Sequence, residues 1–292
     1  MSLVIELFTI YPSYYLCTIF YLGLLVGSFL NVVILRLPVM MERDWQQQCC
    51  ELLELDDPES NKEKGLFNLL TPRSHCPGCK HQISAIENIP VISYLFLKGK
   101  CKKCGNKISL RYPLIELVSA LSAVIVAYYF GVSYQAMFAI CLTWALIALS
   151  MIDFDHQLLP DDITLPLLWL GIIINIFSIF TDIESSVLGA IFGYVSLWSV
   201  YIIFKIVTGK EGMGHGDFKL LAVLGAWFGW QLLPLIIILS SLVGAVVGIS
   251  LMLFKSHDRN TAIPFGPYLA IAGWISMLWG PYIMSAYLNA VI

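Results

Sequence analysis

Charged residues are scarce in this chain of 292 residues, since Asp, Glu, Lys and Arg make up 13% of it. That is about half the share found in soluble proteins. The 17 Lys and Arg do not outnumber the 20 Asp and Glu, and a net charge of −3 argues against nucleic-acid binding by bulk charge. Hydrophobic residues reach 58%, which excludes a disordered chain. One or two soluble cores could not bury that much apolar surface, so we expect a protein that lies mostly in lipid.

Apolar runs of about 20 residues, the length that a helix needs to cross a bilayer, recur along the chain. Backbone polar groups inside a bilayer must bond within their own segment, so such runs become helices. We predict about eight transmembrane helices, of which the sixth is short and tilted or partial: 14–35, 113–130, 133–152, 163–180, 186–207, 218–230, 232–254 and 264–288. The first run lacks the basic start of a cleaved signal peptide. The predicted fold class is an all-α polytopic membrane protein.

The positions of Lys and Arg predict the orientation, because these residues mark cytoplasmic loops. Twelve of the 17 lie in the segment that begins with Arg36 and ends with Arg111, both included, and eight spans put the remaining five on the same side. Seven spans would put some of them on the opposite side. We therefore predict an external N-terminus and three parts, namely a first transmembrane helix (1–37), a cytoplasmic domain (38–112) and a transmembrane domain (113–292). Residues 51–65 of the middle part are acidic and are expected to form a loop or short helix.

Four of the eight cysteines form two Cys-x-x-Cys pairs, Cys76 with Cys79 and Cys101 with Cys104. Two such pairs let four thiolates surround one zinc ion. Lysines around the second pair stabilise the thiolate charge. Two disulfides are the alternative, which the reducing cytoplasm disfavours. The sequence predicts a structural Zn²⁺ in a small zinc-knuckle domain, and four cysteine ligands leave no open position for catalysis.

Burying a carboxylate in or near a membrane costs free energy, so carboxylates at the ends of spans are candidates for functional residues. Asp153 ends the third span and Asp217 follows the glycine-rich segment Gly212–Gly216 at the start of the sixth, so both are expected at one depth on the cytoplasmic side. Two neighbouring carboxylates cannot both ionise cheaply, and such a pair can activate water and protonate a leaving amine, as in aspartic proteases. The alternative is that acids cap helix ends, which we prefer for Asp161 and Asp162.

The glycine-rich segment before Asp217 is not a dinucleotide-binding loop. The pattern G-x-G-x-x-G fails because Asp217 occupies its final glycine position, and no strand precedes it. His215 and His156 lie close to the two aspartates, but a single histidine beside glycines is more often a spacer than a base. The two aspartates are therefore the candidates for chemistry.

These segments together resemble the type 4 prepilin leader peptidases, also called prepilin peptidase/N-methyltransferases, over nearly the whole chain. The segment Gly27–Pro38 resembles their opening motif, and Arg111–Glu116 resembles the entry to their second span. The two Cys-x-x-Cys pairs resemble the paired cysteines of the bifunctional branch. The segments Asp153–Asp161 and Gly214–Lys219 resemble the two catalytic segments.

The resemblance implies that Asp153 and Asp217 are the catalytic aspartates of an intramembrane aspartic endopeptidase. Asp153 is preferred to Asp155 because it stands seven residues before Pro160, as in the family. The resemblance further implies a multi-pass protein of the bacterial inner membrane that cuts the basic leader from type 4 prepilins and pseudopilins on the cytoplasmic side. Such enzymes then methylate the new amino terminus with S-adenosylmethionine. The expected partners are these protein substrates and the bilayer, with no nucleic acid.

Several alternatives stay open at this point. No soluble methyltransferase fold is visible, so a peptidase without methyltransferase activity is one of them. Asn31, Arg36 and Glu116 could contact cofactor or substrate, or could serve packing and topology. A presenilin-like protease would explain Gly-x-Gly-Asp but not the cysteine pairs. A proton-coupled transporter that uses Asp153 and Asp217 would require charges nearer the bilayer centre and repeated halves with interrupted helices.

Overall fold

The computed structural model describes residues 2–55, 67–210, 212–255 and 264–291, and all regular elements within them are helices apart from two isolated β-bridges. The predicted all-α class is confirmed. The chain forms two compact units, residues 1–132 and 133–292. The predicted division at residues 37 and 112 stays a prediction. Most of the acidic segment 51–65 lies outside the described residues, and its first residues end a helix.

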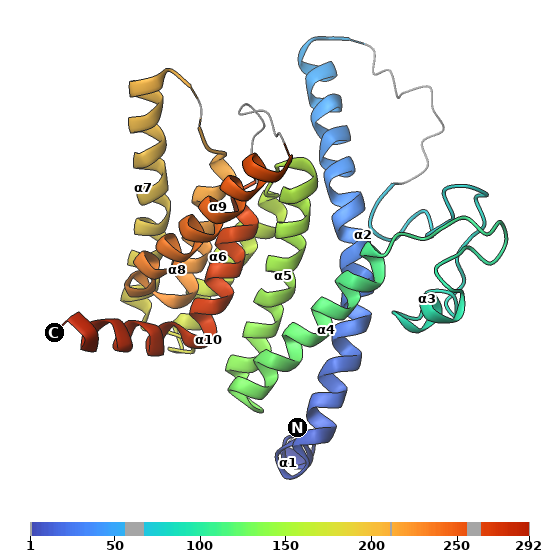
Figure 1. Ribbon diagram of the computed structural model, residues 1–292, viewed down its shortest axis with the longest axis horizontal. Helices are drawn as coiled ribbons and strands as arrows, with labels where there is room; N and C mark the ends of the chain where they lie inside the picture. The colour runs from blue at the N-terminus through green and yellow to red at the C-terminus, as the bar shows by residue number, and fades with distance from the viewer. Residues whose placement is uncertain (1, 56–66, 211, 256–263, 292) are drawn as a thin grey trace. The chain divides into compact units, whose positions relative to one another are not determined.

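The described residues of unit 1 form four helices, which are α1 (Ser2–Ile10), α2 (Pro12–Leu52), α3 (Ile92–Phe96) and α4 (Arg111–Phe130) (Figure 1). With 41 residues, α2 is about 60 Å long, twice the thickness of a hydrocarbon core. It therefore continues well beyond the predicted end of the first span and includes Pro38. Proline removes one intrahelical hydrogen bond, which the flanking turns of this long helix tolerate.

Glycines let α2 and α4 pack backbone to backbone. A Cβ on Gly23 would lie 2.6 Å from the Cα of Ala120, and a Cβ on Gly27 would lie 2.6 Å from the Cα of Glu116. Small residues at four-residue spacing are the usual means by which membrane helices approach this closely. The contact fixes Glu116 against the middle of α2.

Unit 2 contains six α-helices and a short 3₁₀ helix (Trp230–Leu232) among its described residues: α5 (Tyr134–His156), α6 (Asp161–Asn175), α7 (Ile183–Thr208), α8 (His215–Phe228), α9 (Leu233–Lys255) and α10 (Gly266–Val291). Across the described part of both units, six helices are long and apolar enough to cross a membrane. Each of the eight predicted spans contains a helix, but α6 and α8 have only 15 and 14 residues, about 22 Å. The count of eight spans is therefore not confirmed.

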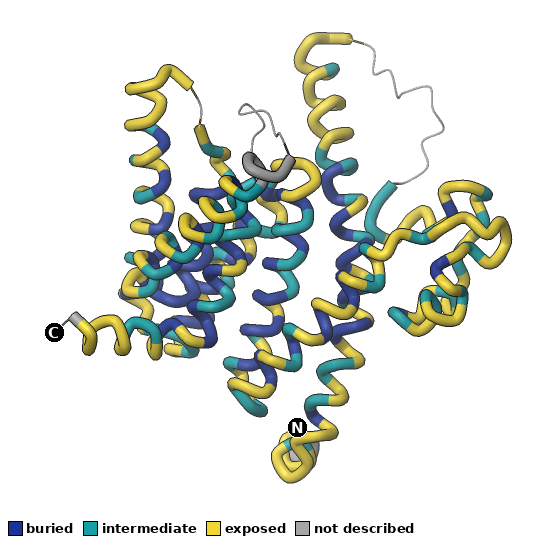
Figure 2. Tube along the Cα trace, in the orientation of Figure 1, coloured by how far each residue is buried: buried dark blue, intermediate teal, exposed yellow. Residues whose placement is uncertain are grey.

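The short helix α8 is the centre of unit 2. It contacts α6, α7, α9 and α10, and every residue from Asp217 to Phe228 is buried except Lys219, which is half-buried (Figure 2). A helix that is apolar on all sides must be enclosed by other helices or by lipid. Here it is enclosed by other helices, so its length need not match the bilayer.

Glycines also allow the close contact between α7 and α8. Gly189 and Gly193 form a Gly-x-x-x-Gly pair on α7, the arrangement that lets membrane helices approach each other. A Cβ on Gly189 would overlap the carbonyl group of Gly225, and a Cβ on Gly193 would lie 2.6 Å from the carbonyl oxygen of Leu221. No larger residue fits at these positions without moving one helix.

Buried side chains bind the carbonyl groups that the end of α8 leaves without helical partners. The Asn175 amide donates to the carbonyl oxygens of Ala226 at 2.9 Å and Trp227 at 3.0 Å. The Ser186 hydroxyl donates to the Ala226 oxygen at 2.6 Å. These bonds offset the cost of burying polar backbone and hold α8 at a fixed depth between α6 and α7.

We predict that Gly189→Ala destabilises the protein by about 1–3 kcal/mol, the usual cost of forcing an extra carbon into a packed contact. The measurement is the unfolding transition of the purified protein in detergent. Val187→Leu, a change on the exposed face of the same helix, is the control and should leave the transition unchanged. Equal stability of the two variants would contradict the packing described here.

Candidate functional site

Asp153 lies one turn from the C-terminal end of α5 and is buried, with 5% of its surface exposed. Its Oδ2 atom accepts a hydrogen bond from the backbone N–H of Gly266, at the start of α10, with a distance of 2.9 Å. A Cβ at residue 266 would lie 2.6 Å from the same oxygen, so only glycine allows this approach. The bond joins residues 113 apart in the chain and fixes the direction of the carboxylate.

Asp217 lies in the first turn of α8 and is also buried, with 7% of its surface exposed. Its own backbone N–H donates to the carbonyl oxygen of Gly214, the N-cap residue of the helix, at 3.3 Å. The N-terminal end of a helix stabilises a negative charge because its free N–H groups point outward. The start of α8 therefore stabilises a negative charge on Asp217, and Gly214, which has no side chain, leaves room for another molecule to approach the carboxylate.

Leu159 connects the surroundings of the two aspartates. A Cβ on Gly216 would lie 2.7 Å from the Cβ of Leu159, and a Cβ on Gly266 would lie 3.3 Å from its Cδ2. The beginnings of α8 and α10 thus meet on this one side chain. The two carboxyl groups are close enough for the charge of Asp153 to act on Asp217. The structure therefore brings together the two aspartates that the sequence singled out.

An ion pair that the sequence did not predict lies beside them. The Nζ atom of Lys219 contacts both carboxylate oxygens of Asp161 at 2.7 Å. Asp161 begins α6 and Lys219 belongs to the first turns of α8, so the pair ties the start of α8 to the start of α6. It thereby positions the turn that carries Asp217.

The expectation that Asp161 and Asp162 cap a helix is wrong. Pro160 is the N-cap of α6 and no side-chain hydrogen bond caps this end, so both acids lie within the first turn. Pro160 has an extended backbone conformation (φ −61°, ψ 130°), which suits the residue before a helix. The Asp161 side chain binds Lys219 instead of capping the helix. Asp162 is exposed, like Asp155.

The two histidines have different surroundings. His215 packs against the rings of Tyr201 and Phe218, with centroid distances of 5.1 and 5.5 Å. His156 lies exposed in the last turn of α5, where a cation is favourable. Neither arrangement assigns a histidine to acid–base chemistry.

Two buried, mutually interacting carboxyl groups can perform general acid–base chemistry on a water molecule. Because their charges repel, one group tends to hold a proton while the other is an anion. The anion can take a proton from water and the acid can give one to a leaving group. This is the chemistry of peptide hydrolysis without a covalent intermediate.

Unit 1 contains the second candidate site, in which the sulfur atoms of Cys76, Cys79, Cys101 and Cys104 lie within 4.8 Å of one another. All four are free cysteines rather than disulfides. Two of the Sγ–Sγ distances are 3.7 Å (Cys76 to Cys104) and 3.9 Å (Cys79 to Cys101). Ligands 2.3 Å from a tetrahedral zinc are separated by about 3.8 Å, so the four sulfur atoms fit this ion.

The two pairs form turns with the same backbone hydrogen bonds. The N–H of Lys80 donates to the carbonyl of Cys76, and the N–H of Gly105 donates to that of Cys101, both at 2.9 Å. Residues 80 and 105 both have a positive φ, +57° and +70°, which glycine adopts without strain and lysine does not. Each turn is closed by an isolated β-bridge, between residues 75 and 82 and between residues 100 and 107.

Backbone N–H groups in these turns point at the first sulfur of each pair. The N–H groups of Cys79 and Gly78 lower the pKa of the Cys76 thiol to about 6. Those of Cys104 and Lys103 lower the pKa of Cys101. The turns thus favour the thiolate of the first cysteine in each pair, the form that binds zinc. Although the N–H of Asn106 acts to lower it, the pKa of Cys104 is raised to about 12 by the neighbouring cysteine side chains.

Comparison with known proteins assigns both regions to one family. Residues 21–130, which include all four cysteines, match the family described as "Bacterial Peptidase A24 N-terminal domain". Residues 140–249, which include both aspartates, match the "Type IV leader peptidase family".

Three relatives have the name "Prepilin leader peptidase/N-methyltransferase". The protein from Stutzerimonas stutzeri is 58% identical over 95% of this chain and 94% of its own length. The protein from Pseudomonas aeruginosa is 56% identical over the same shares of both chains. The protein from Aeromonas salmonicida is 51% identical over the full length of both. No solved structure matches the chain.

We predict that the purified protein holds about one zinc ion per chain, measured by inductively coupled plasma mass spectrometry. Cys101→Ser should lose it, because three thiolates leave the tetrahedron incomplete. Cys141→Ser, a change of an exposed cysteine in α5, is the control and should retain the metal. A metal-free wild type, or equal zinc in both variants, would show that the cluster has another role.

Proposed function

Because this chain belongs to the type IV leader peptidase family, we propose that it removes the leader peptides of type 4 prepilins and pseudopilins and then methylates the new amino terminus. The proposal assigns peptide hydrolysis to Asp153 and Asp217. The observation that carries it is the burial of these two carboxyl groups, from helices far apart in sequence, within reach of each other's charge. The proposed enzyme is an intramembrane aspartic endopeptidase.

In the proposed reaction, one ionised carboxylate takes a proton from water while the oxygen attacks the carbonyl carbon of the scissile peptide bond. The protonated carboxyl group of the other aspartate donates a hydrogen bond to the carbonyl oxygen. The carbon–nitrogen bond then breaks, and the leaving amine takes a proton from the pair. The N–H of Gly266 keeps the Asp153 carboxylate in position. Apart from its chain neighbours, the only described atom within 4 Å of a Cβ on Gly214 would be a carboxylate oxygen of Asp217, so this residue leaves space for an extended peptide beside Asp217.

The proposed location is the bacterial inner membrane, with the aspartates and the cysteine domain on the cytoplasmic side. The distribution of Lys and Arg supports this side, since the loop between α2 and α4 holds most of them. A substrate with a basic leader would then keep its leader in the cytoplasm and its apolar helix in the bilayer.

Two further groups belong to the proposal. Cys76, Cys79, Cys101 and Cys104 would hold a structural zinc ion, which stabilises the loops between α2 and α4. S-adenosylmethionine supplies a methyl group, which bonds to the free amine as the carbon–sulfur bond breaks, its electron pair going to sulfur and the amine proton to solvent. The enzyme's own contribution is to bind the new amino terminus and this donor together.

We expect Asp153→Asn and Asp217→Asn each to lower the rate of prepilin cleavage by about a thousandfold or more, because an amide neither takes nor gives the proton. Cleavage is measured on a purified prepilin in detergent, with the size of the product read by mass spectrometry. Both variants should still fold, since asparagine has nearly the same shape as aspartate.

Asp155→Asn and Asp162→Asn are the controls, because both acids are exposed, Asp155 on the same helix as Asp153 and Asp162 in the first turn of α6. Both controls should cleave within about threefold of the wild type. Rapid cleavage by either Asp153→Asn or Asp217→Asn would refute the assignment of the two aspartates.

The two activities should separate when the cysteine domain is altered. Cys79→Ser is expected to reduce methylation of an already cleaved pilin by at least about tenfold, while prepilin cleavage falls less, because the aspartates belong to the other unit. Methyl transfer is followed with a radiolabelled donor on a pilin prepared without its leader. A wild type that cleaves but never methylates would favour the alternative of a peptidase alone.

A further inference from the structure

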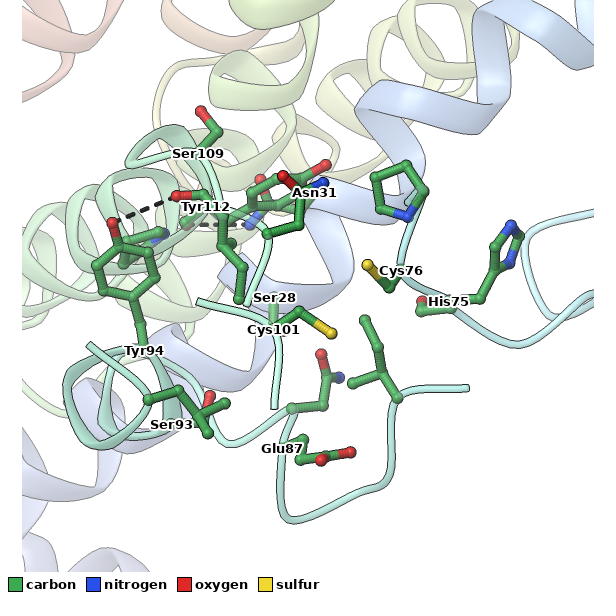
Figure 3. Close-up of a pocket in the computed structure, with 18 of the residues that line it drawn as sticks. Ser28, Asn31, His75, Cys76, Glu87, Ser93, Tyr94, Cys101, Ser109 and Tyr112 are labelled. Atoms are coloured by element: carbon green, nitrogen blue, oxygen red, sulfur yellow. Dashed lines mark hydrogen bonds between the residues drawn. The ribbon is translucent and has the colours of Figure 1, made fainter. Parts of the chain in front are cut away.

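Unit 1 contains a pocket of about 480 Å³ between α2, the start of α4 and the cysteine loops. Pockets of this volume enclose one small molecule. In Figure 3, Tyr94 lies on the left of the pocket, His75 on the right and Glu87 at the bottom. Asn31, Arg36 and Glu116, whose roles the sequence left open, all line it.

Two buried polar side chains of the membrane helices form the inner wall. Asn31 of α2 and Glu116 of α4 are exposed by only 6% and 8%. The Asn31 amide donates to the carbonyl oxygens of Gly27 and Tyr112, both at 3.2 Å. A carboxylate buried at the edge of a bilayer is costly unless it has a function, and in the wall of a pocket it attracts a cation.

The backbone around Glu116 is held in a strained conformation. Val91 has a φ of +59°, which is rare for a β-branched residue. Its N–H donates to Oε2 of Glu116 at 2.7 Å, and both residues line the pocket. Such strain persists where the surrounding structure requires it, most often at binding and active sites. The contact fixes the carboxylate and leaves lone pairs for a further partner.

The outer wall carries the other charges. Hydrogen bonds from the backbone and hydroxyl of Ser84 lower the pKa of the Glu87 carboxyl, so this group is an anion at neutral pH. Lys102 and Lys107 are exposed at the edge of the pocket. Tyr94 also lines the pocket, and its hydroxyl donates to the carbonyl oxygen of Ile108 at 3.4 Å.

We infer that this pocket binds S-adenosylmethionine, with the sulfonium group at Glu116 and the adenosine at the outer wall. The inference rests on the proposed methyltransferase function and assigns the site of its donor. A buried carboxylate matches a sulfonium cation, and a carboxylate such as Glu87 is the usual partner of ribose hydroxyl groups. The Tyr94 ring provides a face for the adenine, and the two lysines match the donor's carboxylate.

The orientation of S-adenosylmethionine in the pocket follows from the positions of Glu116 and Glu87. Glu116 belongs to a membrane helix, whereas Glu87 belongs to the loops between the two cysteine pairs. A pilin with its apolar helix in the bilayer would present its amino terminus on the side of Glu116. The methyl group must therefore lie at that end, and the adenosine at the other.

The experiment measures binding of S-adenosylmethionine and of S-adenosylhomocysteine, its uncharged thioether product, to the purified full chain in detergent by equilibrium dialysis. Glu116→Gln should raise the Kd of S-adenosylmethionine by about tenfold or more, since it removes a charge-assisted contact, and that of S-adenosylhomocysteine by less than about threefold. Glu87→Gln should raise both Kd values by about the same factor. Only a residue that faces the sulfonium separates the two ligands.

Zinc content, measured for each variant, verifies that unit 1 has folded. Asn88→Trp is an independent variant, because residue 88 is exposed and lines the pocket, so a large ring there should block both ligands without disturbing the core. Glu51→Gln changes an exposed carboxylate near the end of α2, away from the pocket, and is the matched control that should bind like the wild type.

The possible failures are distinguishable. If the wild type binds and uses the donor while all three pocket variants bind both ligands normally, the pocket is not the donor site and the proposed function stands. If these variants instead weaken binding of a cleaved pilin, the pocket holds the substrate's amino terminus and the inference is wrong. If the wild type neither binds the donor nor methylates, the methyltransferase proposal fails and the inference fails with it.

Discussion

The enclosure of α8 by other helices is the constraint on which the architecture of unit 2 depends. A 14-residue helix is too short to span a hydrocarbon core, and it is stable here because α6, α7, α9 and α10 surround it. Gly189 and Gly193 of α7 make the closest of these contacts possible. Because the helix is fixed along its length, the position of its first turn is fixed too, and that turn carries Asp217.

The same constraint explains how two carboxyl groups can be buried together. The N–H of Gly266 donates to Asp153, and Asp217 lies in the first turn of α8, where free N–H groups favour a negative charge. These interactions offset part of the desolvation cost of one negative charge, but they do not offset two charges that repel each other. An arrangement of this kind is poor for stability and suited to proton transfer. Its persistence in the fold supports a functional role for the pair.

Much of this organisation could be predicted from the sequence because it depends on local pattern. Apolar runs predicted the helices, and the spacing of two Cys-x-x-Cys pairs predicted a cluster with the sulfur separations of a tetrahedral site. The depth of α8 could not be predicted, because a run that is apolar on all sides looks the same whether lipid or protein surrounds it. The Gly266 bond to Asp153 and the Lys219 pair with Asp161 join residues 113 and 58 positions apart. No spacing rule relates such residues, and the tertiary fold alone brings them together.

The proposed activities use different units, and chemistry fixes their order. Methylation requires a free amine, which peptide hydrolysis at the aspartates creates, so a block at the aspartates must stop both reactions on an intact prepilin. A block at the pocket stops only the second. Each unit holds a buried carboxylate that costs stability, Glu116 in unit 1 and the aspartate pair in unit 2. Two reactions on one substrate require one set of reactive groups for each reaction, and a buried carboxylate in each unit meets this requirement. A peptidase alone would need the aspartate pair but would not explain the burial of Glu116.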